Sequence, residues 1–235
     1  MEAEASPFIK HLGLQLADDF FPKEAPFLAY SGSHKGVSIT VVTNGKDSAY
    51  GTGVDNVGTL AAGTATFLAL QKLRPQLLIN AGTCGGFQRK GAAIGDVFLT
   101  TAAAFHDRRI PLPGFEAYGT GKVEMTSGIA KLAADLSFKT GVVTTSDSLD
   151  ATDACQKLML ENDASVKDME AAAIAWSAKL HGVPFIGVKV VTDIVDGDRP
   201  TQEEFLENLG TAAQKLQAAL PKVVEYLAEK GHDEL

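Results

Sequence analysis

The sequence has few cysteines, few arginines and no long apolar run, and each shortage excludes a class of protein. Its two cysteines, Cys84 and Cys155, are too few for a disulfide framework and have no metal-type spacing with histidine. No uncharged apolar stretch is long enough to span a bilayer, and the acidic start MEAEASPF contains no apolar signal segment. The five arginines are scattered and the net charge is −8, which argues against a nucleic-acid partner. We therefore expect a reduced, soluble, cytoplasmic protein without a metal, membrane or nucleic-acid partner.

Apolar residues are abundant, at 45% of the 235 residues, which is enough for the core of one α/β domain over residues 1–235. Apolar and β-branched runs predict strands at 37–43, 76–79, 96–101, 140–144 and 185–191. Helical periodicity predicts helices at 56–73, 126–136, 169–180 and 201–230, with Pro221 as a candidate break in the last. Strands that are apolar on both faces and alternate with helices predict an α/β fold, with helices on both sides of a parallel or mixed sheet.

Three informative segments each follow a predicted strand, at 80–87, 146–150 and 192–198. Ligands in α/β sheets bind beyond the carboxyl ends of the strands, so these segments are expected to converge on one site. The first segment, NAGTCGGF, is glycine-rich and would let the backbone approach a ligand closely, although a tight turn explains it equally well. It lacks the spacing of a P-loop or of a dinucleotide-binding fingerprint.

Glu170 begins the alanine-rich helix predicted at 169–180. The helix dipole favours a carboxylate there by about 0.3–1 kcal/mol, so ordinary helix-start chemistry is sufficient to explain it. The functional alternative is a carboxylate that accepts hydrogen bonds from vicinal sugar hydroxyls.

Asp193 lies between apolar pairs, Val190-Val191 before it and Ile194-Val195 after it. Burial raises the pKa of a carboxyl group, which keeps a proton available near neutral pH for general acid catalysis. The alternative is a turn-forming aspartate, but Asp196-Gly197 already supplies the turn. We favour the functional interpretation.

His106-Asp107 could form a catalytic pair by residue type. Neighbouring residues on a strand point to opposite faces, so a structural or interface role is the better interpretation. Cys84 has no base beside it in the sequence and is interpreted as a packing residue.

The segments NAGTCGGF, SDSLD, KDMEAAAIA and VTDIVDGD, in this order and spacing, resemble the purine nucleoside phosphorylase/nucleosidase superfamily. Within it the chain is most similar to plant-type 5′-methylthioadenosine/S-adenosylhomocysteine nucleosidases. The resemblance implies a three-layer α/β sandwich with a mixed, partly barrel-like central sheet, assembled as a homodimer without cofactor or metal. It implies hydrolysis of the N-glycosidic bond of methylthioadenosine to adenine and the thioribose, a reaction of methionine salvage. Whether S-adenosylhomocysteine is also a substrate stays open.

The resemblance also implies roles for individual residues. Asp193 matches the acid that protonates adenine N7, and Glu170 matches the carboxylate that holds the ribose hydroxyls. The further substrate-binding positions are Thr83 in the glycine-rich segment, Leu149 against adenine, Met169 against the ribose, Lys167 and Asp168 beside it, and Ile110 and Phe115 around the 5′-alkylthio group from a partner subunit.

Glu4, within Met1-Glu2-Ala3-Glu4-Ala5, matches the carboxylate that activates water. In the family this motif follows a first apolar β-strand, and the present sequence begins at the motif. A central strand would therefore be missing, and the edges of its neighbours would be unpaired. Three alternatives are open: the chain is truncated, the fold tolerates the loss of this strand, or Glu4 is displaced.

Rival functions remain open at this stage. A purine nucleoside phosphorylase would need cationic phosphate ligands, whereas Asn80 stands where hexameric phosphorylases carry arginine. A non-catalytic storage-type relative would suit a missing strand, although the retention of Met169, Glu170 and Asp193 argues against it. A generic carboxylate-based sugar hydrolase has only its paired acids in support.

Overall fold

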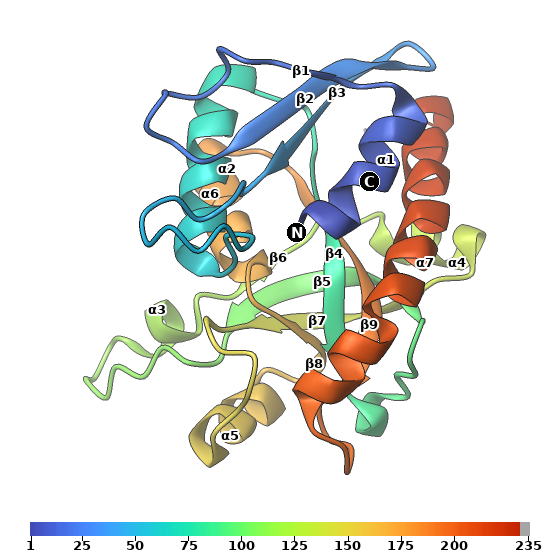
Figure 1. Ribbon diagram of the computed structural model, residues 1–235. Helices are drawn as coiled ribbons and strands as arrows, with labels where there is room; N and C mark the ends of the chain where they lie inside the picture. Colours follow the sequence, from blue (N-terminus) through green and yellow to red (C-terminus); the bar gives the residue numbers. More distant parts are fainter. Residues whose placement is uncertain (231–235) are drawn as a thin grey trace.

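The computed structural model describes residues 1–230, which form a closed β-barrel flanked by helices and capped by a small second sheet (Figure 1). The strands are β1 (Gln15–Leu16), β2 (Leu28–His34), β3 (Val37–Thr43), β4 (Leu78–Gly86), β5 (Val97–Phe105), β6 (Val123–Glu124), β7 (Lys139–Thr145), β8 (Ala164–Asp168) and β9 (Phe185–Ile194). The helices are α1 (Glu2–Leu12), α2 (Thr59–Leu73), α3 (Glu116–Thr120), α4 (Ile129–Leu136), α5 (Asp153–Glu161), α6 (Ala171–His181) and α7 (Thr201–Lys230), with a short 3-10 turn at Gln88–Lys90. Within residues 1–230, no helix has the length and apolar content needed to cross a bilayer.

Five strands close the barrel, in the order β5-β7-β8-β4-β9, with β9 returning to pair with β5. The sheet is mixed, because β4 and β9 run parallel while β9 meets β5 antiparallel. Strand β9 is buried along almost its whole length, which explains its nearly continuous apolar sequence. The predicted fold class, a mixed and partly barrel-like α/β structure, is confirmed.

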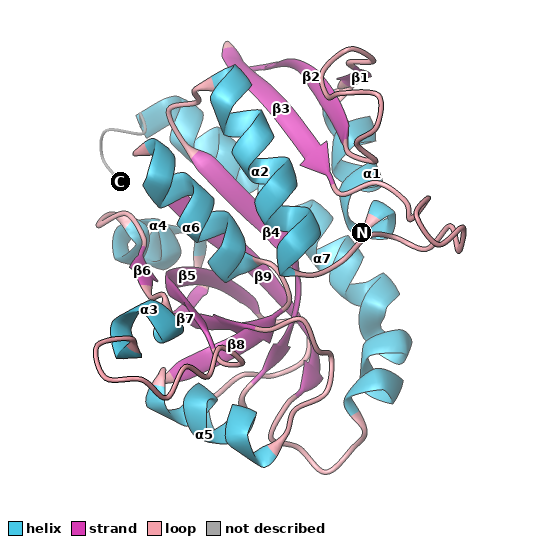
Figure 2. Cartoon of the chain, turned by 90° about the vertical axis from the view of Figure 1, so that its left-hand side faces the viewer, coloured by secondary structure: helices cyan, strands magenta, loops and turns pink. Residues whose placement is uncertain are grey.

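Helices cover both sides of the barrel, and each side has its own apolar core (Figure 2). On one side α6 packs against α2, and the alanine side chains of 171–173 are small enough to let α6 approach the strands closely. On the other side α7 packs along β9 and β4, with Leu216, Leu220 and Val223 in its buried stripe.

The first three strands form a separate antiparallel sheet, β1-β2-β3. Among the residues that the structure describes, β3 is hydrogen-bonded to β2 and not to the barrel. The edge of β4 opposite β9 pairs with β8 only at Gly85 and Gly86. Within residues 1–230, β3 and the 78–84 part of β4 therefore each have one edge without a ladder partner.

Several predicted boundaries were wrong. The glycine-rich segment is not a loop after a strand ending at residue 79, since β4 continues to Gly86 and pairs with β9 throughout. A Cβ at Gly86 would lie 2.7 Å from Ala92 and 2.8 Å from Val191, so glycine here serves close packing. Helix α7 continues through Pro221, because its apolar stripe holds both halves against the barrel. The sequence patterns missed α1, α5 and β8.

Gly187 in β9 provides a test of the barrel packing. A Cβ at this position would clash with the buried Thr100 side chain, approaching its Cγ2 to 3.0 Å. We expect Gly187→Ala to destabilise the protein by about 1–3 kcal/mol through overpacking. Thermal unfolding would report this as a fall in Tm of about 2–4 °C per kcal/mol.

Gly210→Ala is the matched control, because Gly210 is exposed in α7 and a Cβ there meets open space. It should stabilise the helix by about 0.5–1 kcal/mol. Equal effects of the two substitutions on Tm would contradict the packing assigned to β9.

Candidate active site

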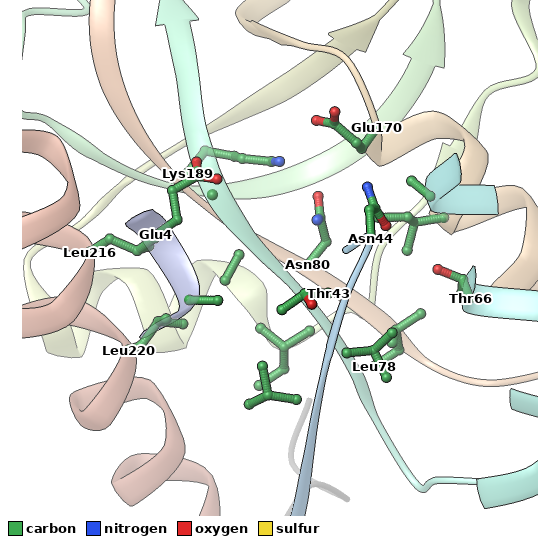
Figure 3. A pocket seen from close by; sticks show the side chains of 18 of the residues that line it. Glu4, Thr43, Asn44, Thr66, Leu78, Asn80, Glu170, Lys189, Leu216 and Leu220 are labelled. Atoms are coloured by element: carbon green, nitrogen blue, oxygen red, sulfur yellow. The ribbon is translucent and has the colours of Figure 1, made fainter. Parts of the chain in front are cut away.

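A cavity of about 880 Å³ opens at the carboxyl ends of β4, β8 and β9 and extends between β3 and β4 (Figure 3). It is lined by eight of the residues expected from the sequence and its family resemblance: Glu4, Thr83, Leu149, Lys167, Asp168, Met169, Glu170 and Asp193. Ile110 and Phe115 do not line it, and both lie in the loop before α3. Their expected role in a partner's pocket stays a prediction. The three acids thus come together from α1, the start of α6 and β9.

Glu4 points from the first turn of α1 toward β4 and lines the cavity. One carboxylate oxygen accepts hydrogen bonds from the Thr83 backbone N–H at 2.6 Å and from the Thr83 hydroxyl at 2.8 Å. The other oxygen contacts the α-ammonium group of Met1. Burial alone would raise the pKa of Glu4, but the ammonium and the Thr83 donors together hold this pKa below its ordinary value. Glu4 is therefore an ionised carboxylate over a wide pH range.

A buried ion pair lies directly behind the acids. Lys189 Nζ on β9 is 2.7 Å from Asp168 Oδ2 on β8, and both side chains are almost fully buried. Strand β4 lies between these two strands, and the ion pair passes Gly82, where an added Cβ would lie 3.8 Å from Nζ and 3.3 Å from Glu4 Oε1. Burial would lower the pKa of Lys189, but Asp168 and Glu170 outweigh it and raise this pKa. The lysine stays charged.

Asp168 accepts two further hydrogen bonds. Its Oδ1 accepts from the Thr145 hydroxyl at 2.6 Å, and Oδ2 accepts from the Ala171 N–H at 2.9 Å. The second bond satisfies an amide in the first turn of α6, a group that has no partner within the helix. The pair thereby fixes the helix that carries Glu170 at its start.

Glu170 occupies the N-cap position of α6, one residue before the helix proper. Its Oε1 accepts a hydrogen bond from the Gly58 N–H at 2.8 Å, which ties the start of α6 to the start of α2. Burial, reinforced by the nearby negative charge of Asp168, raises the pKa of Glu170. In Figure 3 its carboxyl group faces the same cavity as Glu4 and Lys189.

Asp193 is buried at the carboxyl end of β9, with 2% of its surface exposed. Burial raises its pKa, against the opposing effects of the Thr192 hydroxyl, which donates to Oδ1 at 2.7 Å, and of Lys167. Gly85 makes room for the carboxyl group, since a Cβ there would lie 2.7 Å from Asp193 Oδ2. The environment therefore favours the protonated form of Asp193 to a higher pH than usual.

Lys167 holds the loop after β7 over the cavity. Its Nζ donates to the carbonyl oxygens of Ser148 at 2.9 Å and Leu149 at 2.6 Å. These bonds place the half-exposed side chain of Leu149 at the cavity wall. Burial lowers the pKa of Lys167, although the surrounding carboxylates oppose it.

His106 and Cys84, which the sequence analysis assigned to structure, are buried near the site. His106 Nδ1 lies 3.0 Å from the Thr144 hydroxyl, and burial, with a contribution from Lys167, lowers its pKa to about 4. Burial raises the pKa of the Cys84 thiol well above its ordinary value, so it remains protonated. Neither side chain lends charge to the cavity at neutral pH.

The arrangement combines three acids with different properties. Glu4 is ionised, Asp193 has a raised pKa that favours its protonated form, and Glu170 lies between the starts of α2 and α6. This set suits bond cleavage in which a leaving group gains a proton while water loses one. Within residues 1–230, no group of three His, Cys, Asp or Glu side chains is placed to hold a metal ion. Sequence reasoning missed Lys189, and the available signal was a single lysine inside the apolar strand FIGVKVV.

Comparisons with known proteins agree with this geometry. The sequence model of the phosphorylase superfamily matches residues 1–225. A 5′-methylthioadenosine nucleosidase of Arabidopsis thaliana is 45% identical over 228 residues, covering 97% of this chain and 84% of the relative. A 5′-methylthioadenosine/S-adenosylhomocysteine nucleosidase of the same plant is 44% identical over 231 residues, covering 98% and 90%.

Solved structures lead to the same family. The apo structure of an Arabidopsis thaliana 5′-methylthioadenosine nucleosidase superposes with a TM-score of 0.96 at 44% identity, covering 100% of this chain and 96% of that one. With nearly the whole chain matched by sequence and by structure, this protein belongs to the phosphorylase superfamily and, within it, to the 5′-methylthioadenosine/S-adenosylhomocysteine nucleosidase family.

Proposed function

We propose that this protein hydrolyses the N-glycosidic bond of 5′-methylthioadenosine to adenine and methylthioribose. The observation that carries the proposal is the convergence of Glu4, Glu170 and Asp193 on one cavity, with the pKa of Glu4 lowered and that of Asp193 raised. The relatives named for this activity, at 44–45% identity over nearly the whole chain, support it.

The first half of the reaction is departure of the base. Asp193 donates its proton to N7 of adenine, the C1′–N9 bond breaks, and the bonding electrons leave with the base. The sugar becomes oxocarbenium-like, as in other glycoside hydrolysis. Because burial disfavours the carboxylate form of Asp193, this residue is suited to begin the reaction as an acid.

The second half is the attack of water. Glu4 accepts a proton from water as the water oxygen bonds to C1′, and its ionised state suits it to act as this base. Glu170 accepts hydrogen bonds from the ribose hydroxyls, which orients the sugar between the two other acids. Met169 packs on the ribose, Leu149 contacts adenine, and Thr83 both contacts the substrate and orients Glu4.

Water is favoured over phosphate as the nucleophile, because both lysines in the site are already engaged. Lys189 pairs with Asp168, and Lys167 donates to two carbonyl oxygens. A phosphate beside the acids would have to compete with these partners for Lys167 or Lys189, and it would meet the negative charge of Glu4.

We further propose a cytoplasmic homodimer that acts in methionine salvage. The two free cysteine thiols suit a reducing compartment. The loop before α3 exposes Leu112 and Phe115, and α3 exposes Tyr118; these large apolar side chains suit an interface with a second copy. Methionine salvage follows from the proposed substrate.

Asp193→Asn tests the general acid. An amide cannot supply the proton, so the rate of adenine release should fall by about 10²–10⁴-fold while Tm stays close to that of the wild type. The control is Asp198→Asn, an exposed aspartate in the following turn, which should retain its activity. Near-normal activity of the Asp193→Asn protein would rule out the assignment.

The pH dependence follows from the two shifted pKa values. Activity should rise as Glu4 loses its proton, at a pH below the ordinary glutamate range, and fall as Asp193 loses its proton, above the ordinary aspartate range. Thr192→Val removes the donor that lowers the pKa of Asp193, so the descending limb should move to higher pH. Thr83→Val removes a hydroxyl donor that lowers the pKa of Glu4. In this variant the ascending limb, and not the descending one, should move to higher pH.

The measurement is kcat/KM for methylthioadenosine from pH 3 upward, with unfolding monitored at each pH. If both threonine variants shifted the same limb, the division of roles between Glu4 and Asp193 would be wrong.

Phosphate distinguishes hydrolysis from phosphorolysis. Adenine release from methylthioadenosine should be the same with and without inorganic phosphate, and the other product should be the free sugar. Parallel assays with S-adenosylhomocysteine measure how long a 5′ substituent the cavity accepts. A sugar phosphate product, or a rate that rises steeply with phosphate, would identify a phosphorylase instead, and binding of adenine without turnover would identify a non-catalytic relative.

A further inference from the structure

Helix α2 (Thr59–Leu73) begins without a cap from its own segment. Its N-cap residue is Gly58, which has no side chain that could accept a hydrogen bond, and its first turn contains no acidic residue. The amides of the first turn have no partner within a helix, so they need an acceptor from outside it. For α2 this acceptor has to come from a distant part of the chain.

Asp147, in the loop after β7, supplies the missing acceptor. Its Oδ1 accepts a hydrogen bond from the Thr59 N–H at 2.6 Å, and its Oδ2 accepts one from the Thr59 hydroxyl at 2.6 Å. Both oxygens of the carboxylate are therefore used on the first residue of α2, 88 positions away in the sequence. The helix dipole also favours a negative charge at this end of the helix.

The loop that carries Asp147 is itself held in place from two sides. The Asp147 N–H donates to Asp107 Oδ2 at 3.2 Å, which fastens the loop to the segment after β5. On the other side, Lys167 of β8 donates to the carbonyl oxygens of Ser148 and Leu149. Asp147 therefore meets the start of α2 as a fixed acceptor.

Gly58 joins this cap to the start of α6, the helix that packs beside α2 (Figure 2). Its φ of 93° favours glycine, and a Cβ there would lie 2.5 Å from Asp147 Oδ1. Two consecutive amides thus reach two different carboxylates: Thr59 N–H donates to Asp147, and Gly58 N–H donates to Glu170 Oε1 at 2.8 Å. Within residues 1–230, the Gly58 amide is the one hydrogen-bond donor to the Glu170 carboxyl group.

We propose that Asp147 is a positioning residue for ribose recognition. By capping α2 it holds the Gly58 N–H against Oε1 of Glu170, which orients this carboxylate so that Oε2 faces the two vicinal hydroxyls. Asp147 itself does not line the cavity, and it acts through Gly58 and Glu170. The link to ribose rests on the proposed function, whereas the cap and its contact with Glu170 do not.

The pKa of Glu170 separates this role from a direct effect of charge. Loss of a nearby negative charge would by itself lower this pKa, whereas loss of the Gly58 hydrogen bond would raise it. Asp147→Ala should therefore raise the pKa of Glu170 further above its ordinary value. Asp147→Asn should not, since the amide oxygen can still accept from the Thr59 N–H and the amide NH₂ can donate to the Thr59 hydroxyl.

The measurement is a ¹³C NMR titration of the side-chain carboxyl groups in protein labelled at glutamate, with Glu170→Gln used to assign the resonance. Gly58→Ala disturbs the same contact from the other side, so it should also raise the pKa of Glu170. The matched control is Asp153→Ala, which removes an exposed carboxylate from the first turn of another helix, α5. It should leave the titration of Glu170 unchanged.

Adenine release provides a second readout, which a purely structural role would not move. The ratio of kcat/KM for methylthioadenosine to kcat/KM for its 2′,3′-dideoxy analogue should fall by about tenfold in the Asp147→Ala protein. The reason is that a hydrogen bond to a charged carboxylate is lost only with the substrate that carries the hydroxyls. The Asp147→Asn and Asp153→Ala proteins should keep the ratio of the wild type.

Three results would overturn the proposal. These are an unchanged or lowered pKa of Glu170 in the Asp147→Ala protein, an equal loss of kcat/KM on both substrates, and an Asp147→Asn protein that behaves like Asp147→Ala. A wild-type protein that released no adenine would refute the proposed function instead. The titration of Glu170 would still test the cap, so the two failures are distinguishable.

Discussion

The arrangement of the site depends on one buried ion pair, Lys189 with Asp168. It connects β9 to β8 past Gly82 of the intervening strand, and Asp168 carries the connection on to Thr145 of β7 and to the first turn of α6. Loss of one partner from such a pair costs about 3–5 kcal/mol, because the other charge is left buried and uncompensated. The pair therefore constrains how the strands pack as well as where charge is placed. It fixes the end of β9, which carries Asp193, and the start of α6, which carries Glu170.

The same pair sets the electrostatic background in which three carboxyl groups acquire different properties. Glu170 responds directly to Asp168, whereas Glu4 and Asp193 respond to their own neighbours. Glu4 has an ammonium group and two Thr83 donors, and its pKa is lowered. Asp193 is buried and accepts a hydrogen bond from the Thr192 hydroxyl; the effect of burial is the larger, so its pKa is raised. Carboxyl side chains thus supply both the proposed base, Glu4, and the proposed acid, Asp193, because the surroundings of the two residues differ.

Local sequence patterns located the parts of the site that follow strands, but not the parts that depend on cross-strand packing. Asp193 and Glu170 were visible because each lies where a strand or helix meets a turn. Glu4 was found only by resemblance, since α1 has no strong signal and its carboxylate is oriented by Thr83, 79 residues away. Lys189 was missed because its partner lies two strands away. The continuation of β4 to Gly86 was missed because glycine usually ends a strand, whereas here it admits Val191 and Asp193.

Burial keeps a proton on the proposed acid, Asp193, beyond the pH at which aspartate normally loses it. The most direct measurement is a ¹³C NMR titration of the side-chain carboxyl groups in protein labelled at aspartate, with Asp193→Asn used to assign the resonance. We expect one carboxyl resonance whose pKa lies clearly above the ordinary value of about 3.9 and which is absent from the variant. An Asp193 resonance that titrates at or below the ordinary value would contradict it.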